Sequence, residues 1–101
     1  MSYQVAQNGE ETVVFLDGDV DLERSPSARK VLLEWVEKGQ NVVVDMSEVS
    51  YIDSSGVASL VEALQASKKN NVDFYLKQVS EPALKVFKLA RLEKVFNIIE
   101  G

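Results

Sequence analysis

The period of the hydrophobic pattern changes repeatedly along this 101-residue chain, and this change constrains the fold more than any other feature. Continuous runs of β-branched, aromatic and other apolar residues at 12–16 and 42–46 are typical of strands covered on both faces. Apolar residues recur at helical spacing in 28–36 and 57–64. Strands that alternate with helices predict a parallel sheet with helices packed on it, because right-handed crossovers join such strands.

The remaining segments extend this alternation. A short first strand is expected over 3–6, and Asn8-Gly9 signals a hairpin turn into the following strand. The segment 72–77 alternates apolar and polar residues, which predicts a strand with one wetter face, and 80–90 predicts a third helix. We therefore expect an α/β fold with a mixed sheet, mostly parallel with one antiparallel N-terminal strand. A chain of this length has room for one domain, 1–101.

Composition excludes several classes of function. The chain has no cysteine and no histidine, which removes disulfides, thiolate metal sites and the commonest general base. A serine nucleophile needs a positioned base, so we expect no enzyme activity. No glycine-rich phosphate loop is present, and we expect neither a cofactor nor a metal.

Charge and hydropathy limit the partners. With 11 basic and 16 acidic residues the formal charge is -5, which is a poor match for nucleic acid. No apolar run approaches the roughly 20 residues that span a bilayer, and no leader segment is recognisable. We expect a cytoplasmic protein that does not insert into membranes.

Function in an open α/β sheet gathers in the loops beyond the carboxyl ends of the strands. Three loops are expected there, at 17–25, 47–56 and 78–82. The first is acidic, with carboxylates at Asp17, Asp19, Asp21 and Glu23. A calcium loop also needs a central glycine and a glutamate at a fixed distance, and both are missing. A solvated acidic loop, able to attract a basic partner surface, is the preferred interpretation.

The second loop contains Tyr51-Ile52-Asp53-Ser54-Ser55-Gly56-Val57, just before a predicted helix. In one interpretation Asp53, Ser54 and Ser55 only cap the helix, while Gly56 permits a tight turn. In the other, a serine here accepts a phosphate, whose oxygens meet unpaired N–H groups and the positive end of the helix dipole. A partner docked against the uncharged serine would then face a dianion. The residues alone leave both interpretations open.

The C-terminal part is locally basic. Its cations are Lys77, Lys85, Lys88, Arg91 and Lys94. They are most simply a solvated helix face, and they also leave a surface that could dock an anionic partner.

Together these segments resemble the STAS domain family (sulfate transporter and anti-sigma factor antagonist) in its small bacterial form. The resemblance covers nearly the whole chain and is most specific over 42–61, where Asp53-Ser54-Ser55-Gly56 follows a valine-rich strand. Gly18-Asp19-Val20-Asp21 and the closing segment 90–96 also resemble family elements. The resemblance implies a binding protein that is controlled by phosphorylation of Ser54.

The family's partners follow from the same resemblance. The unphosphorylated protein would bind a serine kinase, an anti-sigma factor with a histidine-kinase-like ATPase fold, and a PP2C-type phosphatase would remove the phosphate. Asp53 would flank the acceptor, Ser55 and Gly56 would shape the start of the helix, and Asp19 and Asp21 would lie near the partner. The unbound protein is expected to be a monomer.

One segment departs from this pattern. Residues 22–26 read Leu-Glu-Arg-Ser-Pro, where sporulation-type members usually have a Thr-Ala pair before the helix. The alternative is a constitutive STAS subunit of a phospholipid-transport ABC complex. A response-regulator receiver is disfavoured because the chain is short for that fold.

Overall fold

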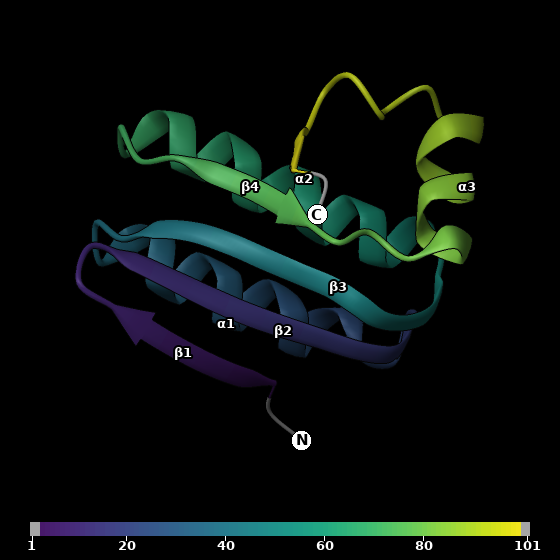
Figure 1. The fold of residues 1–101 in the computed structure, drawn as a ribbon, viewed down its shortest axis with the longest axis horizontal. Helices are drawn as coiled ribbons and strands as arrows, with labels where there is room; N and C mark the ends of the chain where they lie inside the picture. The colour runs from purple at the N-terminus through teal and green to yellow at the C-terminus, as the bar shows by residue number, and fades with distance from the viewer. Residues whose placement is uncertain (1–2, 100–101) are drawn as a thin grey trace.

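One five-stranded sheet runs through the molecule, with its strands side by side in chain order (Figure 1). A computed structural model of the chain describes residues 3–99. The elements are β1 (Gln4–Asn8), β2 (Glu11–Val20), α1 (Ser25–Glu37), β3 (Asn41–Ile52), α2 (Ser54–Lys69), β4 (Phe74–Lys77), α3 (Glu81–Leu89) and β5 (Asn97–Ile99).

Strand directions match the predicted mixed sheet. β1 and β2 form an antiparallel hairpin, and Gly9 at its turn has φ 65, which glycine adopts without strain. The pairs β2–β3, β3–β4 and β4–β5 are all parallel. A short segment near the end of the chain, for which the sequence predicted no strand, supplies the edge strand β5. The predicted fold class is confirmed.

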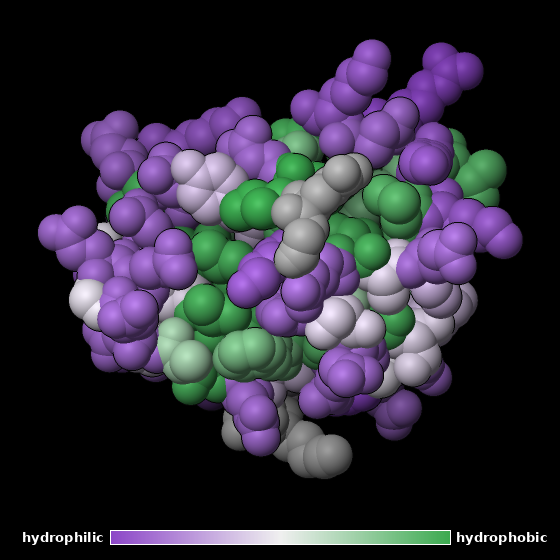
Figure 2. All heavy atoms as spheres, viewed as in Figure 1, coloured by the Kyte–Doolittle hydropathy of each residue, from purple (hydrophilic) through white to green (hydrophobic). Residues whose placement is uncertain are grey.

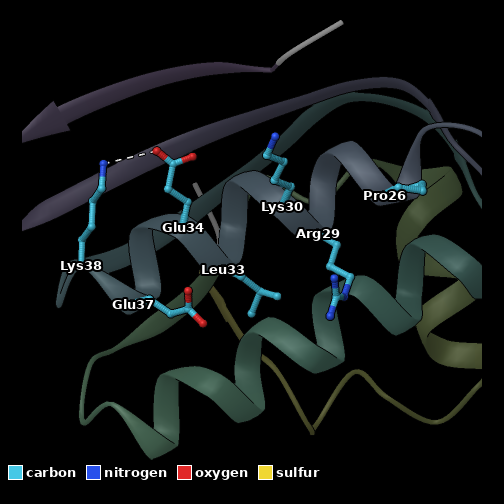
Figure 3. Close-up of a pocket in the computed structure, with 7 residues that line it drawn as sticks. All are labelled: Pro26, Arg29, Lys30, Leu33, Glu34, Glu37 and Lys38. Carbon is cyan, nitrogen blue, oxygen red and sulfur yellow. Dashed lines mark hydrogen bonds and ion pairs between the residues drawn. The ribbon is translucent and has the colours of Figure 1, made fainter.

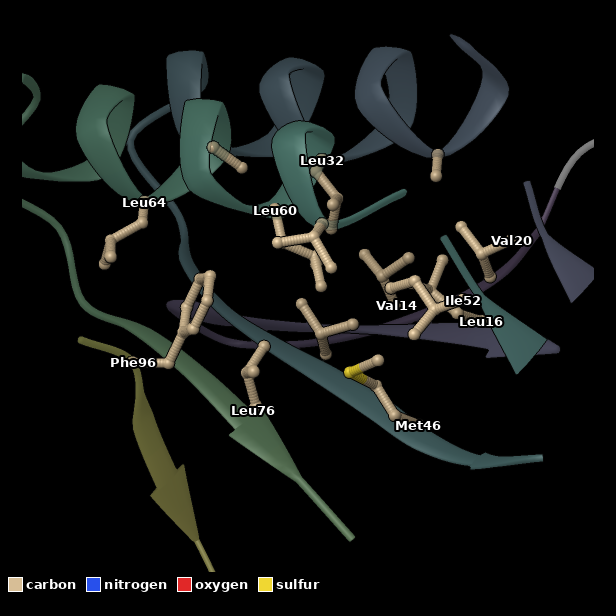
Figure 4. Packing of buried hydrophobic residues seen from close by; sticks show 14 of the residues in the cluster. Val14, Leu16, Val20, Leu32, Met46, Ile52, Leu60, Leu64, Leu76 and Phe96 are labelled. Carbon is tan, nitrogen blue, oxygen red and sulfur yellow. The ribbon is translucent and has the colours of Figure 1, made fainter. Parts of the chain in front are cut away.

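The helices α1 and α2 lie on the same face of the sheet (Figure 1). Successive right-handed crossovers that advance in one direction across a sheet place their helices on one side. The core fills the space between these layers, where Val14, Leu16 and Met46 of the sheet meet Leu32 of α1 and Leu60 of α2 (Figure 4). The third helix, α3, lies toward the carboxyl ends of β3 and β4 and buries Ala83 and Phe87.

The opposite face of the sheet has no helix over it among residues 3–99, so the expectation that the strand at 12–16 is covered on both faces is wrong. Phe15 on this face is 36% exposed, whereas its neighbours Val14 and Leu16 are buried against the helices. Figure 2 looks onto this face and shows apolar atoms in its middle with hydrophilic side chains around them.

Two predicted loops are mostly strand. β2 continues through Asp17-Gly18-Asp19 to Val20, and β3 continues to Ile52. The pairing of these strands shifts register near Gly18, which has φ 63. Such a bulge needs a residue that tolerates positive φ, and glycine does. The connections that remain are 21–24 after β2 and Asp53 after β3.

Two details of the helices also differ from the sequence prediction. Ser25, predicted in the loop 17–25, is the buried first residue of α1, and Arg24 is the cap. Ala90, predicted in the helix 80–90, lies just beyond it and is exposed, because α3 ends at Leu89 and the chain turns at Arg91 with φ 58.

Candidate functional site

Ser54 is the first residue of α2 and follows Asp53 directly at the end of β3. It is exposed, and its Oγ has no hydrogen-bond partner within residues 3–99. The N-cap is Asp53, in an extended conformation with φ -108 and ψ -174. The capping interpretation therefore applies to Asp53 alone, and the Ser54 hydroxyl is left without a structural role.

The Asp53 carboxylate joins two separate parts of the chain. Its Oδ1 accepts hydrogen bonds from the backbone N–H groups of Ser55 at 2.9 Å and Gly56 at 3.1 Å. Its Oδ2 accepts one from the backbone N–H of Leu22, also at 3.1 Å. Two N–H groups of the first turn of α2 are thus already occupied, so a phosphate on Ser54 would have to compete with Asp53 for them.

Gly56 lets α2 approach the end of β2 closely. It is buried, and a Cβ atom there would lie 2.4 Å from the Val20 carbonyl oxygen and 2.7 Å from Ile52 Cγ1. No side chain fits in that space without movement of the backbone. Gly56 therefore fixes the distance between the start of α2 and the sheet.

Ser55 has a structural environment. It is half-buried, and its carbonyl oxygen accepts a hydrogen bond of 3.1 Å from the Ser59 hydroxyl. The same hydroxyl is 3.2 Å from the carbonyl oxygen of Ser25 in α1. Ser59 thereby links the first turns of α1 and α2. The sequence analysis missed this link, and a lone serine on an apolar helix face was its only signal.

Two of the four acidic side chains in 17–23 form hydrogen bonds or an ion pair within residues 17–24. The Asp21 carboxylate accepts hydrogen bonds from the backbone N–H groups of Glu23 and Arg24, and Asp17 forms an ion pair of 2.9 Å with Arg24. The hydrogen bond to Asp17 raises the pKa of Arg24 above its ordinary value. Asp19 and Glu23 are exposed.

Turn 21–24 lies next to Asp53 at the start of α2. Asp21, Leu22, Glu23 and Asp53 line a hollow of about 520 Å³. No three His, Cys, Asp or Glu side chains within residues 3–99 come together as a metal ion would require. Asp21 and Asp53 therefore line the same hollow, and Leu22, which also lines it, is hydrogen-bonded to Asp53 through its backbone N–H. Leu22 was not singled out as a site residue, although its side chain is 75% exposed.

Ser54 also lies at the edge of a groove between α2 and α3, here named the α2–α3 groove, with a volume of about 480 Å³. The groove is lined by Ser54, Val57, Ala58, Val61, Glu62, Val86 and Ala90. Its surface is almost entirely apolar. The sequence pattern did not reveal it, because it forms only where two helices distant in sequence meet.

A larger hollow of about 740 Å³ follows α1 and shares no residue with the α2–α3 groove (Figure 3). Its lining is mostly charged, and Glu34 and Lys38 pair across one turn of the helix at 3.2 Å. Solvated side chains of this kind form weak surface pairs. Among the residues that the structure describes, no helix is long and apolar enough to cross a membrane.

These features define a small α/β domain that presents an exposed serine and an apolar groove on its surface. The model of the STAS domain family matches residues 2–100, and the chain belongs to that family. The resemblance predicted from the sequence is therefore confirmed.

Two curated relatives are anti-sigma-B factor antagonists. The protein of Staphylococcus epidermidis is 30% identical over 89 residues, which cover 87% of this chain and 82% of the relative. That of Bacillus subtilis is 26% identical over 98 residues, covering 97% and 90%.

The fold is shared with the anti-sigma factor antagonist SpoIIAA. Its unphosphorylated form has a TM-score of 0.83 at 19% identity and covers 99% of this chain and 88% of that one. Its phosphorylated form, from Bacillus, has a TM-score of 0.78 at 19% identity and covers 99% and 91%.

Proposed function

We propose that this chain is a regulatory binding protein of the anti-sigma factor antagonist type, switched by phosphorylation of Ser54. The unphosphorylated form binds a serine kinase that is also an anti-sigma factor with a histidine-kinase-like ATPase fold, and phosphorylation releases it. One observation carries this proposal: Ser54 is exposed at the start of α2 while Asp53 does the capping.

The charge around Ser54 explains how phosphorylation would act. A phosphoserine adds about -1.5 to -2 charges to a chain whose formal charge is already -5. Asp53 holds two of the nearest N–H groups, and Asp21 and Glu23 lie beside Asp53. The dianion is therefore poorly compensated, and a partner that buries it loses binding energy. The fold is retained because the hydroxyl makes no hydrogen bond that folding needs.

The family relationship supports the same proposal. The curated relatives are named as antagonists of an anti-sigma-B factor, and the structural relative is known in phosphorylated and unphosphorylated forms. In this proposal a PP2C-type phosphatase restores the binding form, and the chain acts in the cytoplasm as a monomer between partners.

Phosphopeptide mass spectrometry tests the acceptor. After incubation with the cognate kinase and ATP, the wild-type chain gains one phosphate, on Ser54. Ser54→Ala abolishes the modification, whereas Ser55→Ala, the matched control one residue away, retains it. Phosphate on Ser55 or on another hydroxyl would disprove the assignment.

A binding measurement tests the switch. Ser54→Glu should weaken binding to the kinase at least about tenfold, because each 1.4 kcal/mol of lost interaction is tenfold in affinity. Its free energy of unfolding should change by less than about 0.5 kcal/mol, as for an ordinary surface substitution. Binding equal to that of the wild type would contradict the switch and favour the alternative of a constitutive transport-complex subunit.

A further inference from the structure

The α2–α3 groove has the form of a docking site for another protein rather than for a small molecule. Its lining contains only two polar residues, Ser54 and Glu62. Small-molecule sites combine an apolar wall with several convergent polar groups, and this groove lacks them. The exposed small residues Ala58 on α2 and Ala90 directly after α3 leave room for side chains of a partner.

Apolar surface continues outward from the groove across α3. Val86 lines the groove and also a neighbouring hollow of about 560 Å³ that includes Pro82, Leu84 and Leu89. Leu89 is 85% exposed. An exposed leucine alone is ordinary, but a contiguous apolar surface beside a groove marks an interaction site.

The charges around this surface indicate what it binds. Glu62, the acidic residue in the groove, forms a solvent-exposed ion pair with Arg29 of α1. On the α3 side the exposed cations Lys85 and Lys88 line the neighbouring hollow beside Leu89, together with one carboxylate, Glu81. Residues 81–94 contain four cations and two carboxylates in a chain of formal charge -5. The apolar surface therefore has a cationic border on one side, which favours an acidic partner.

We propose that the α2–α3 groove receives an amphipathic helix of the partner kinase, with its apolar face in the groove and acidic residues toward Lys85 and Lys88. The inference rests on the proposed function and names the docking element of that same partner. An apolar groove lined by side chains from two helices can accept a helix of a partner, which is recognised through apolar residues at i, i+3 or i+4, and i+7.

The same geometry connects docking with the switch. Ser54 lines the groove, so its phosphate would stand where the partner helix enters. The dianion would then be desolvated against the apolar face of that helix. Phosphorylation releases the partner without any rearrangement of α2.

Site-specific crosslinking tests the proposal directly, because the chain has no cysteine of its own. Single-cysteine variants Ala58→Cys and Ala90→Cys, labelled with a photoreactive maleimide, are mixed with the kinase that phosphorylates the wild-type chain. Both should crosslink to one kinase segment with amphipathic helical spacing and acidic residues on its polar side. Ser27→Cys, an exposed control on α1, should not crosslink to that segment. Crosslinks from Ala58→Cys and Ala90→Cys to a basic or extended segment, or none at all, would overturn the proposal.

Binding measurements give an independent test. Ala58→Arg and Ala90→Arg fill the groove and should each weaken kinase binding about tenfold or more. The charge reversal Lys85→Glu with Lys88→Glu should weaken it by about tenfold, whereas Lys68→Glu with Lys69→Glu, at the far end of α2, should leave it unchanged.

The outcomes separate this inference from the proposed function. Circular dichroism first shows that the two arginine variants are folded. If they then bind the kinase like the wild type while Ser54→Glu does not bind it, only the assignment of the groove as the docking site fails. If Ser54→Glu binds like the wild type, the phosphorylation switch fails, whatever the groove variants do.

Discussion

At the scale of single residues, one carboxylate organises the site. Asp53 caps α2 with one oxygen and holds the backbone of Leu22 with the other. The start of α2 and turn 21–24 are thereby fixed to each other. This arrangement leaves the neighbouring Ser54 hydroxyl exposed and outside the cap.

The first prediction concerns this carboxylate. Asp53→Ala should lower the free energy of unfolding by about 1–2 kcal/mol, the usual range for loss of a side-chain cap. Asp53→Asn keeps one oxygen that can accept from Ser55 and Gly56 but loses the bond from Leu22, and it should lose less. Urea denaturation measures both values. Equal losses for the two variants would show that the hydrogen bonds to Ser55 and Gly56 do not stabilise the start of the helix.

The second prediction concerns Gly56. Gly56→Ala should destabilise the protein by about 2–3 kcal/mol, because the new Cβ atom would overlap the Val20 carbonyl oxygen and buried side chains cannot move aside freely. Gly39→Ala is the matched control. Gly39 has φ 81 and open space around it, so only backbone strain of about 1 kcal/mol is expected there. A smaller loss at Gly56 than at Gly39 would contradict the close approach of α2 to β2.

The sequence singled out the segment from Asp53 to Gly56 but could not assign its cap. Asp53, Ser54 and Ser55 are all good capping residues, so propensity does not distinguish among them. The choice depends on the long β3, which ends at Ile52 and leaves only Asp53 in the capping position. The α2–α3 groove was not predictable either, because it depends on how two helices pack.

At the scale of whole elements, the hydrophobic period predicted the order of helices and strands along the chain. It underestimated the lengths of β2 and β3. The Asp17-Gly18-Asp19 sequence resembles a turn, yet β2 passes through it. The Arg24 guanidinium donates a hydrogen bond of 3.0 Å to the Asp17 carbonyl oxygen and pairs with the Asp17 carboxylate. These contacts come from a residue beyond the strand, so the local sequence does not reveal them.

The third prediction tests how α3 is attached. Phe87 is fully buried, and its ring centroid lies 5.5 Å from that of Phe96. Phe87→Ala should reduce the free energy of unfolding by about 3–5 kcal/mol, as expected for a large aromatic residue in a core. Phe15→Ala, on the open sheet face, should cost distinctly less because Phe15 is already 36% exposed. Similar losses would mean that the open face is covered in solution.

At the scale of the whole molecule, the surface is electrically uneven. Acidic residues gather around 17–23, and cations gather on and after α3. Ser54 lies beside both the acidic turn and the groove that α3 borders. A partner that spans the site therefore meets both kinds of charge, which favours one docking orientation over others.

The last prediction concerns stability at alkaline pH. Tyr3 is buried, and its hydroxyl has no hydrogen-bond partner within residues 3–99. Burial raises the pKa of Tyr3 above its ordinary value, although the nearby Arg24 opposes this. The folded protein thus holds the phenol proton more tightly than the unfolded chain does. The stabilisation that comes from this tighter binding of the proton is fully present below the pKa of Tyr3 in the unfolded chain, about 10. It is lost as the pH rises through the higher pKa of Tyr3 in the folded protein.

Tyr3→Phe removes this titration, and because the phenol is unpaired, the variant should match or slightly exceed the wild type at pH 7. Urea denaturation between about pH 8 and pH 11 should show a steeper alkaline loss for the wild type than for Tyr3→Phe, since the pKa of Tyr3 lies above about 10 when folded. Tyr75→Phe separates burial from charge as the cause, because the half-buried Tyr75 has its pKa raised mainly by the charge of Asp73. Parallel curves for the wild type and Tyr3→Phe would contradict the burial of the phenol.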